Sequence, residues 1–128
     1  MPRIHLTDEQ LDTEVLFRIK RHVGRKNAIG RWELVAKIYG AVLPQDQNDS
    51  NPADRLIREA VARLRKRGVL ICDMGNGQGR YLAETIEEYQ QFRIKYSSRA
   101  YEILETLREM DKAAEQTWDS NPLQMRLV

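Results

Sequence analysis

The chain has 128 residues, of which 41% are hydrophobic and 31% charged, so it can form one domain with at most one appended element. The longest apolar run, residues 69–72, is strand-sized, whereas a membrane span needs about 20 residues. A single cysteine excludes an internal disulfide and a cysteine-rich zinc site, and two histidines are too few for most metal cages. We therefore expect no metal, no cofactor and no membrane contact. Because the N-terminal residues lack the apolar stretch of a signal peptide, we expect a cytoplasmic protein.

The net charge of +2 is unevenly distributed along the chain. Residues 51–83 carry 7 basic and 3 acidic side chains, a local charge of +4. Residues 84–120 carry 5 basic and 9 acidic side chains, a local charge of −4. Opposite charge on neighbouring segments indicates a basic working surface and an acidic part that faces elsewhere.

The first periodic segment covers residues 9–22, where apolar side chains recur at helical spacing. Thr7 and Gln10 have the spacing of a capping box at its start, and Gly24 is expected to close it. Residues 27–29 then leave room for only a very short extended piece.

A second, shorter helix is predicted over residues 31–39, and Gly40 ends it. Residues 41–50, which contain Pro44 and the polar run 45–50, are predicted to form a loop, which is long for a small domain.

The third helix has the clearest start in the sequence. Asn51 can cap it, and Pro52 occupies the first helical position, where a missing N–H has no cost. The helix should run to Arg67 and stop at Gly68. One side is apolar, with Ile57, Ala60, Val61 and Leu64, and the opposite side carries Arg55, Arg58, Glu59, Ala62 and Lys66.

Residues 69–73 predict a short strand, residues 75–79 a glycine-rich turn, and residues 80–83 the returning strand of a hairpin. Thr85 and Glu88 have the spacing of a second capping box.

A long helix is predicted over residues 86–117, which contain no glycine or proline. At about 1.5 Å per residue it would be roughly 48 Å long, more than a domain of this size can cover with its own core. Residues 119–128 are predicted to form a flexible tail.

This order of elements resembles the winged helix-turn-helix superfamily of DNA-binding domains. The resemblance is carried by residues 51–68, which read NPADRLIREAVARLRKRG, by the strand VLICD that follows, and by the glycine-rich segment up to Leu82. It implies a mainly α fold with a small β-hairpin wing (α+β), followed by a long C-terminal helix. The expected organisation is a DNA-binding domain over residues 7–84, a dimerisation helix over residues 85–118, and the tail. The connection over residues 40–50 is longer than the tight turn usual in the superfamily.

In that superfamily the third helix lies in the major groove, and the wing contacts the DNA backbone or the minor groove. The resemblance therefore places residues 51–67 in the major groove and residues 74–81 on the backbone or in the minor groove. Bidentate arginine to guanine is the commonest specific contact, which favours Arg55 and Arg58 as base readers. The implied DNA contacts are Asn51, Arg55, Arg58, Ala62 and Lys66 on the third helix, Asn76, Gln78 and Arg80 on the wing, and Arg25, Lys26 and Arg31 near the second helix.

Several of these features also have simpler explanations. The basic residues of the third helix could form a solvated face, and Arg65 and Arg67 are expected near acidic partners. The glycine-rich turn opens no helix and lacks a following Lys-Ser/Thr, which argues against a phosphate loop. His22 is expected to cap the carboxyl end of the first helix.

Other reactive or aromatic residues have packing explanations too. Cys72 is expected to be a buried small hydrophobe, with a redox-sensing thiol as the alternative. Trp32 and Tyr39 are expected to pack in the core or between helices rather than to stack on bases. The sequence shows no Ser/His/Asp, Cys/His or paired-carboxylate arrangement, so we expect no enzymatic activity.

The long helix bears on quaternary structure. Apolar and small residues alternate along it at spacings of four and three, as in a coiled coil, which predicts a homodimer. The alternative is a helix folded back against the first helix. The predicted dimer residues are Tyr96, Ala100, Ile103, Leu104, Leu107, Met110 and Ala114, with Thr117 continuing the spacing.

Taken together, these patterns predict a dimeric transcriptional regulator of bacterial or prophage type that binds specific double-stranded DNA, with an inverted-repeat target. Two alternatives stay open. One is an accessory DNA-binding protein of phage or plasmid replication, partition or packaging. The other is a winged-helix protein-interaction module, because the fold alone does not guarantee DNA binding.

Overall fold

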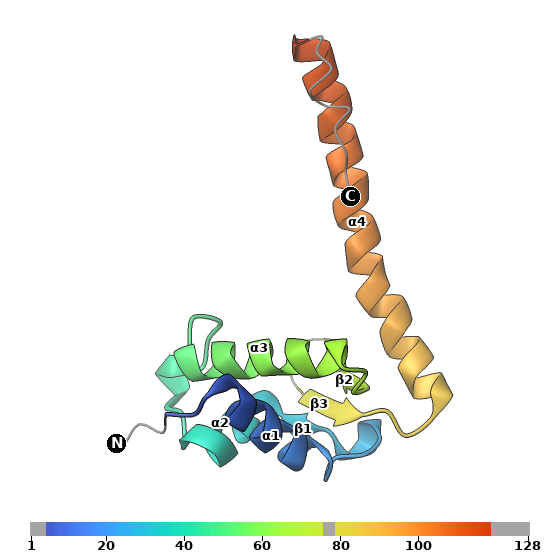
Figure 1. Cartoon of the computed structure of the whole chain (residues 1–128). Coiled ribbons are helices and arrows are strands. Elements are labelled where there is room, and N and C mark those ends of the chain that lie inside the picture. Colours follow the sequence, from blue (N-terminus) through green and yellow to red (C-terminus); the bar gives the residue numbers. More distant parts are fainter. Residues whose placement is uncertain (1–4, 76–78, 119–128) are drawn as a thin grey trace. The chain divides into compact units, whose positions relative to one another are not determined.

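The computed structural model describes residues 5–75 and 79–118. This part of the chain is mainly helical, with one small antiparallel sheet of three strands, as the sequence predicts for the fold class (Figure 1). The elements are, in order, α1 (Asp8–Ile19), the 3-10 turn η1 (Arg25–Asn27), β1 (Ile29–Gly30), α2 (Arg31–Tyr39), the 3-10 turn η2 (Pro44–Asp46), α3 (Pro52–Lys66), β2 (Ile71–Asp73), β3 (Gly79–Leu82) and α4 (Ile86–Trp118). The chain divides into unit 1 (Met1–Phe92) and unit 2 (Arg93–Val128), which we describe separately.

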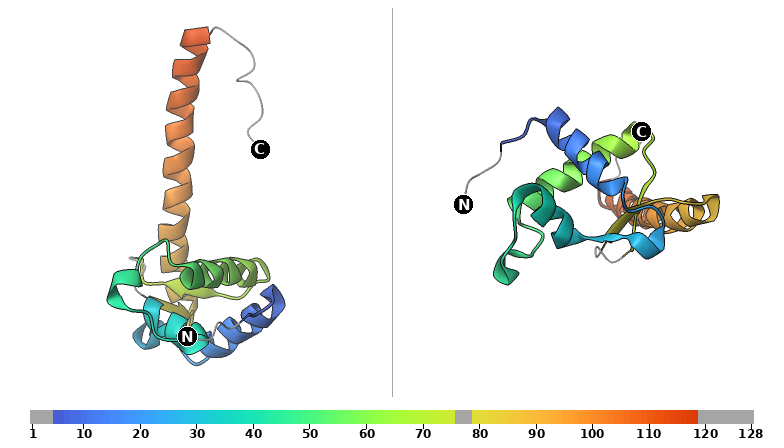
Figure 2. Two further views of the ribbon diagram at one scale, coloured as in Figure 1. Left: turned by 90° about the vertical axis from the view of Figure 1, so that its left-hand side faces the viewer. Right: turned by 90° about the horizontal axis from the view of Figure 1, so that it is seen from below.

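The core of unit 1 lies where α1, α2 and α3 meet. In Figures 1 and 2, α1 crosses α3, and α2 packs beside both. Each helix contributes apolar residues at three- and four-residue spacing, which places them on one face. The buried core side chains are Leu11, Val15 and Ile19 of α1, Leu34, Val35 and Ile38 of α2, Ile57, Ala60, Val61 and Leu64 of α3, and Ile29 and Ile71 of the sheet.

The sheet has the order β1-β3-β2, so β3 is its central strand. Cys72 pairs with Tyr81 and Ile71 with Leu82. Because side chains alternate across a strand, Ile71 faces the helical core, whereas Cys72 and Tyr81 are buried on the other face. The predicted hairpin is present as β2 and β3, and its turn residues 76–78 lie outside the described part. β1 joins it as a third strand through Ile29, which lies opposite Arg80.

Most predicted boundaries agree with the structure to within two residues. The bounds of α2 are those predicted, and Gly40 follows it with a φ of 112°, a conformation that favours glycine. The capping box of α1 is confirmed, since Thr7 and Gln10 bond each other's backbone N–H. Trp32 and Tyr39 pack against the core, as expected.

The predicted carboxyl end of the first helix is wrong, because α1 ends at Ile19. Residues 22–24 instead hydrogen-bond to β3: Leu82 N donates to the His22 carbonyl, and Gly24 N donates to the Leu82 carbonyl. Because residues 22–24 are bonded to β3, they do not continue the helix. His22 does not cap α1, since its Nδ1 lies 2.8 Å from the carbonyl oxygen of Asn27.

The start of α4 is also capped differently from the prediction. Glu88 N donates to Thr85 Oγ1, which is one half of the expected box. The Glu88 carboxylate, however, accepts hydrogen bonds from the backbone N–H groups of Glu84 and Arg25. These bonds lower the pKa of Glu88. They tie the first turn of α4 to η1, so unit 1 continues into α4.

Within the described residues, no helix is long and apolar enough to cross a membrane. The same residues contain no cluster of His, Cys, Asp or Glu side chains that could hold a metal ion.

Neighbouring residues of α3 provide a matched test of this core. Ile57 is fully buried, whereas Leu56 is 40% exposed. We expect Ile57→Ala to lower the free energy of unfolding by about 2–5 kcal/mol, because it leaves a cavity among three helices. Leu56→Ala should cost less than about 1 kcal/mol. Urea denaturation followed by circular dichroism measures both, and equal losses would contradict the assignment of the α3 faces.

Candidate nucleic-acid interface

The first turn of α3 is held by the polar loop that precedes it. Asn51 caps the helix, because its Oδ1 accepts a hydrogen bond from Asp54 N at 3.0 Å. Its Nδ2 donates to the carbonyl oxygen of Asp46, also at 3.0 Å. The predicted base reader Asn51 therefore uses both side-chain polar atoms within the fold, and its contact with DNA stays a prediction.

Asp54 is the central acceptor at this end of α3. Its carboxylate is fully buried and accepts two hydrogen bonds from Arg31, at 3.0 and 2.7 Å. Arg58, one turn along α3, donates a third at 3.0 Å. Arg31 and Arg58 each reach further to Asp49, through its carboxylate and its carbonyl oxygen respectively. This cluster joins the beginning of α2, the 41–50 loop and the beginning of α3.

The cluster changes the proton affinity of its members. Burial alone would raise the pKa of Asp54, but the hydrogen bonds and charge of Arg31, and then those of Arg58, outweigh it and lower the pKa below its ordinary value. The hydrogen bond from Arg31 to Asp54 raises the pKa of the Arg31 guanidinium. Both groups are therefore charged at neutral pH.

A second buried carboxylate, Asp12 of α1, holds the carboxyl-terminal half of α3. Arg63 donates to both of its oxygens at 2.8–3.0 Å, and Arg67 donates to Oδ2 at 2.8 Å. Arg65 points to the sheet instead, with Nε 2.9 Å from the Ile71 carbonyl oxygen and Nη2 3.5 Å from Asp73. The expectation that Arg65 and Arg67 lie near acidic partners is confirmed.

The solvent-facing side of α3 carries a different set of residues. We call Arg55, Glu59, Ala62 and Lys66 the outer ridge of α3, since their spacing of four, three and four places them on one exposed line. In the described part of the chain, the side chains of Arg55 and Lys66 make no hydrogen bond or ion pair. The six basic residues of α3 and its C-cap thus divide into four that donate to acceptors of the fold and two, Arg55 and Lys66, that do not. Of the four, Arg58 and Arg67 are nevertheless exposed.

Arg80, the predicted wing contact, lies on the central strand between Ile29 and Asp73. Burial lowers the pKa of its guanidinium, Asp54 and Asp73 oppose this effect, and the positive charges of Arg65 and Arg31 add to it. No hydrogen bond or ion pair joins its side chain to another described residue.

The remaining predicted contacts are distributed unevenly. Asn76 and Gln78 lie outside the described residues. Arg25 and Lys26 are exposed in η1, which packs against β3, and the backbone N–H of Arg25 is bonded to Glu88. The structure thus brings Arg25 and Lys26 to the sheet, and it places Arg31 in the Asp54 cluster.

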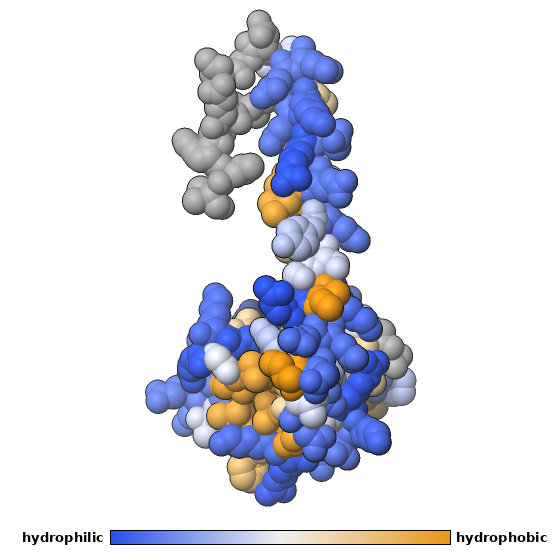
Figure 3. All heavy atoms as spheres, turned by 90° about the vertical axis from the view of Figure 1, so that its right-hand side faces the viewer, coloured by the Kyte–Doolittle hydropathy of each residue, from blue (hydrophilic) through white to orange (hydrophobic). Residues whose placement is uncertain are grey.

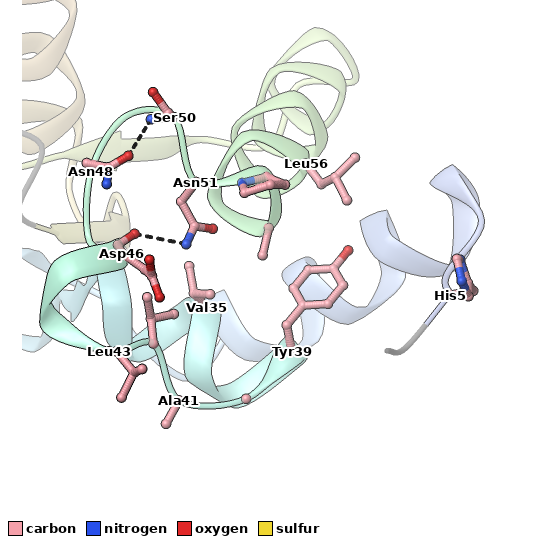
Figure 4. A pocket seen from close by; sticks show the side chains of 14 residues that line it. His5, Val35, Tyr39, Ala41, Leu43, Asp46, Asn48, Ser50, Asn51 and Leu56 are labelled. Carbon is pink, nitrogen blue, oxygen red and sulfur yellow. Dashed lines mark hydrogen bonds between the residues drawn. The ribbon is translucent and has the colours of Figure 1, made fainter. Parts of the chain in front are cut away.

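Glu59, which the helical spacing already placed on the polar side of the third helix, lies in the middle of the outer ridge, between Arg55 and Lys66. Sequence reasoning missed a hollow of about 830 Å³ between the end of α2, the 41–50 loop and the start of α3. Figure 4 shows Tyr39 and Leu56 on its wall. In the sequence, the unusual length of the 41–50 loop is the one feature that points to this hollow.

The buried thiol of Cys72 is as expected from its apolar strand. Cys72 is fully buried, and burial raises its pKa to about 11. A thiol with this pKa is almost entirely protonated at neutral pH, and only the thiolate is a strong nucleophile. A structural role is therefore favoured over a redox-sensing one.

Comparison with protein-family models, with curated proteins and with solved structures finds no match to this chain.

The Asp54 cluster gives a prediction with a defined pH dependence. We expect Asp54→Asn to lower the free energy of unfolding by about 3–5 kcal/mol at pH 7, because Arg31 loses its buried carboxylate acceptor. An unfolded aspartate has a pKa of about 3.9, and the folded value of Asp54 is lower, so its contribution is complete above about pH 4 and is lost as the pH falls. The stability gap between wild type and Asp54→Asn should therefore narrow between pH 7 and pH 3 in urea titrations.

Asp49→Asn is the matched control, since Asp49 bonds to the same Arg31 but its side chain is 89% exposed. It should cost less than about 1 kcal/mol. If the difference in stability between wild type and Asp54→Asn is the same at pH 7 and pH 3, the assignment of a charged Asp54 is contradicted.

Proposed function

We propose that this protein is a transcriptional regulator of winged helix-turn-helix type that binds double-stranded DNA as a homodimer in the cytoplasm, through binding alone and without catalysis. In this proposal α3 enters the major groove, the β2–β3 hairpin contacts the backbone or minor groove, and α4 joins two copies.

The observation that carries the proposal is the division of basic residues on α3. Counting the C-cap Arg67, four of the six are bonded to carboxylates or carbonyls of the fold, while Arg55 and Lys66 are exposed on the outer ridge without such a bond. The major groove, about 12 Å wide, admits one α-helix. A ridge with an arginine near its start and a lysine near its end can contact a base edge and a phosphate.

The neighbourhood of α3 supports the same interpretation. The hairpin with Arg80 follows α3 directly in the chain, and the order α1, β1, α2, α3, β2, β3 is the order expected for a winged helix. Asp54, the buried carboxylate beside the ridge, is neutralised by Arg31 and Arg58. This leaves Glu59 as the acidic side chain of the outer ridge.

Arg55 and Lys66 are assigned different roles in this proposal. Arg55 reads a base, because guanidinium groups bond guanine bidentately. Lys66 contacts a phosphate, which contributes affinity without sequence preference. Arg58 donates through Nε and Nη2 within the fold, so its base contact would use Nη1. Glu59 restricts sequence choice, since a carboxylate repels phosphates but accepts a hydrogen bond from cytosine.

The proposed activity is tested by fluorescence anisotropy with random and genomic double-stranded DNA over a salt series. We expect binding that weakens steeply as salt increases, because bound arginine and lysine release counterions from DNA. Sedimentation of the free protein measures the oligomeric state in parallel, with a dimer expected. A protein without DNA affinity at low salt would contradict the proposal and favour the protein-interaction module.

Single variants test the outer ridge itself. Arg55→Ala should cost about 1–3 kcal/mol on the preferred site and relax discrimination there. Lys66→Ala should weaken binding to all sequences alike and reduce the salt slope by about 1. Arg67→Ala removes the same charge at the C-cap of α3, but Arg67 is bonded to Asp12, so a smaller loss of DNA affinity is expected. Equal losses of DNA affinity for all three variants would contradict the separate roles, because binding would then depend only on the net charge of the protein.

A further inference from the structure

The side chains of α4 in unit 2 present an apolar line that unit 2 itself does not bury. Ile103 is 62% exposed, Met110 60%, Leu104 43% and Leu107 37%. Figure 3 shows hydrophobic side chains as separate spots on the otherwise hydrophilic surface of this helix. Exposed apolar side chains repeated at coiled-coil spacing are typical of a helix with a partner.

We define the α4 seam as the residues that alternate at spacings of four and three along this line. Leu104 lies directly beside it and widens it. The seam residues are Tyr96, Ala100, Ile103, Leu107, Met110 and Ala114.

The two halves of this helix carry opposite charge. Residues 93–101 contain three basic side chains (Arg93, Lys95 and Arg99) and no acidic one, a charge of +3. Residues 102–118 contain five acidic and two basic side chains, a charge of −3. A second copy in parallel orientation would place like charges side by side. A second copy in antiparallel orientation places each basic half beside an acidic half, which is the favourable arrangement.

The sizes of the seam residues lead to the same orientation. In a parallel pair every layer contains two identical residues, so Ala100 would face its own copy and leave a gap, and Tyr96 would crowd its own copy. In an antiparallel pair with Glu105 level with its own copy, Tyr96 meets Ala114, Ala100 meets Met110, and Ile103 meets Leu107. Large residues then face small ones in the outer layers, as close packing requires.

We propose that residues 93–118 of two copies pair as an antiparallel coiled coil centred on Glu105. This inference rests on the homodimer of the proposed function, but not on DNA binding. Leu104 lies next to the two-fold axis and packs against its own copy. At about 1.5 Å per residue, the two Arg93 positions lie roughly 36 Å apart along the pair, close to one turn of DNA.

Intermolecular disulfide formation in the full chain tests the orientation. Cys72 is first replaced by alanine, with circular dichroism to confirm folding, and Ala100→Cys and Met110→Cys are then made separately. In the antiparallel pair, identical positions are offset by ten residues, about 15 Å, beyond the roughly 7 Å Cα separation that a disulfide spans. Neither variant should therefore cross-link alone, whereas an equal mixture of the two should form a disulfide-linked heterodimer. Ser98→Cys, on the opposite side of the helix, is the control and should not cross-link alone or in mixtures.

The outcomes separate this inference from the proposed function. Cross-linking of each variant alone would establish a parallel pair and overturn the antiparallel one, while the homodimer would stand. A dimer by sedimentation with no cross-link in the mixture would overturn the register. A monomer by sedimentation would overturn both the pairing and the homodimer, and DNA affinity, measured separately by anisotropy, would show whether the rest of the proposed function holds.

Discussion

The ion pair between Asp54 and Arg31 is the interaction on which the placement of α3 depends. Burying a carboxylate without a partner would cost free energy of folding. Asp54 is instead paired with Arg31 at the start of α2 and with Arg58 of its own helix. The cap at Asn51 and the bonds to Asp49 order the same region. The 41–50 loop is longer than a tight helical turn, and this polar cluster compensates by fixing both helices at one point.

Asp12 is the buried carboxylate that holds the other end of α3. It accepts hydrogen bonds from Arg63 and Arg67, and it lies on α1, so the two buried carboxylates hold α3 against two different helices. In the described part of the chain, no buried side-chain oxygen or nitrogen lacks a hydrogen-bond partner. Polar groups in this core therefore specify the position of α3 without leaving an uncompensated group.

This internal neutralisation determines what the surface can offer a partner. A count of basic residues on α3 and its C-cap overstates the unpaired charge there, because four of them are bonded to acceptors of the fold. The outer ridge keeps Arg55 and Lys66, and Arg25 and Lys26 are exposed beside the sheet. Binding of a partner by this surface would therefore depend more on the positions of the individual basic side chains than on their total charge. The pairing of α4 would add the spacing between two such surfaces.

The sequence by itself determined the elements of this protein, because capping residues, glycines and apolar spacing act over a few residues. The bounds of α2, the cap at Asn51, the burial of Cys72 and the length of α4 all follow from such local signals. Only the tertiary structure decided where α1 ends, since Leu82, about sixty residues away in the chain, donates a hydrogen bond to the His22 carbonyl and accepts one from the Gly24 N–H. It also decided which arginines are bonded within the fold. That division depends on Asp12 and Asp54, and whether a carboxylate reaches a given guanidinium is set by the packing of helices that are distant in the sequence.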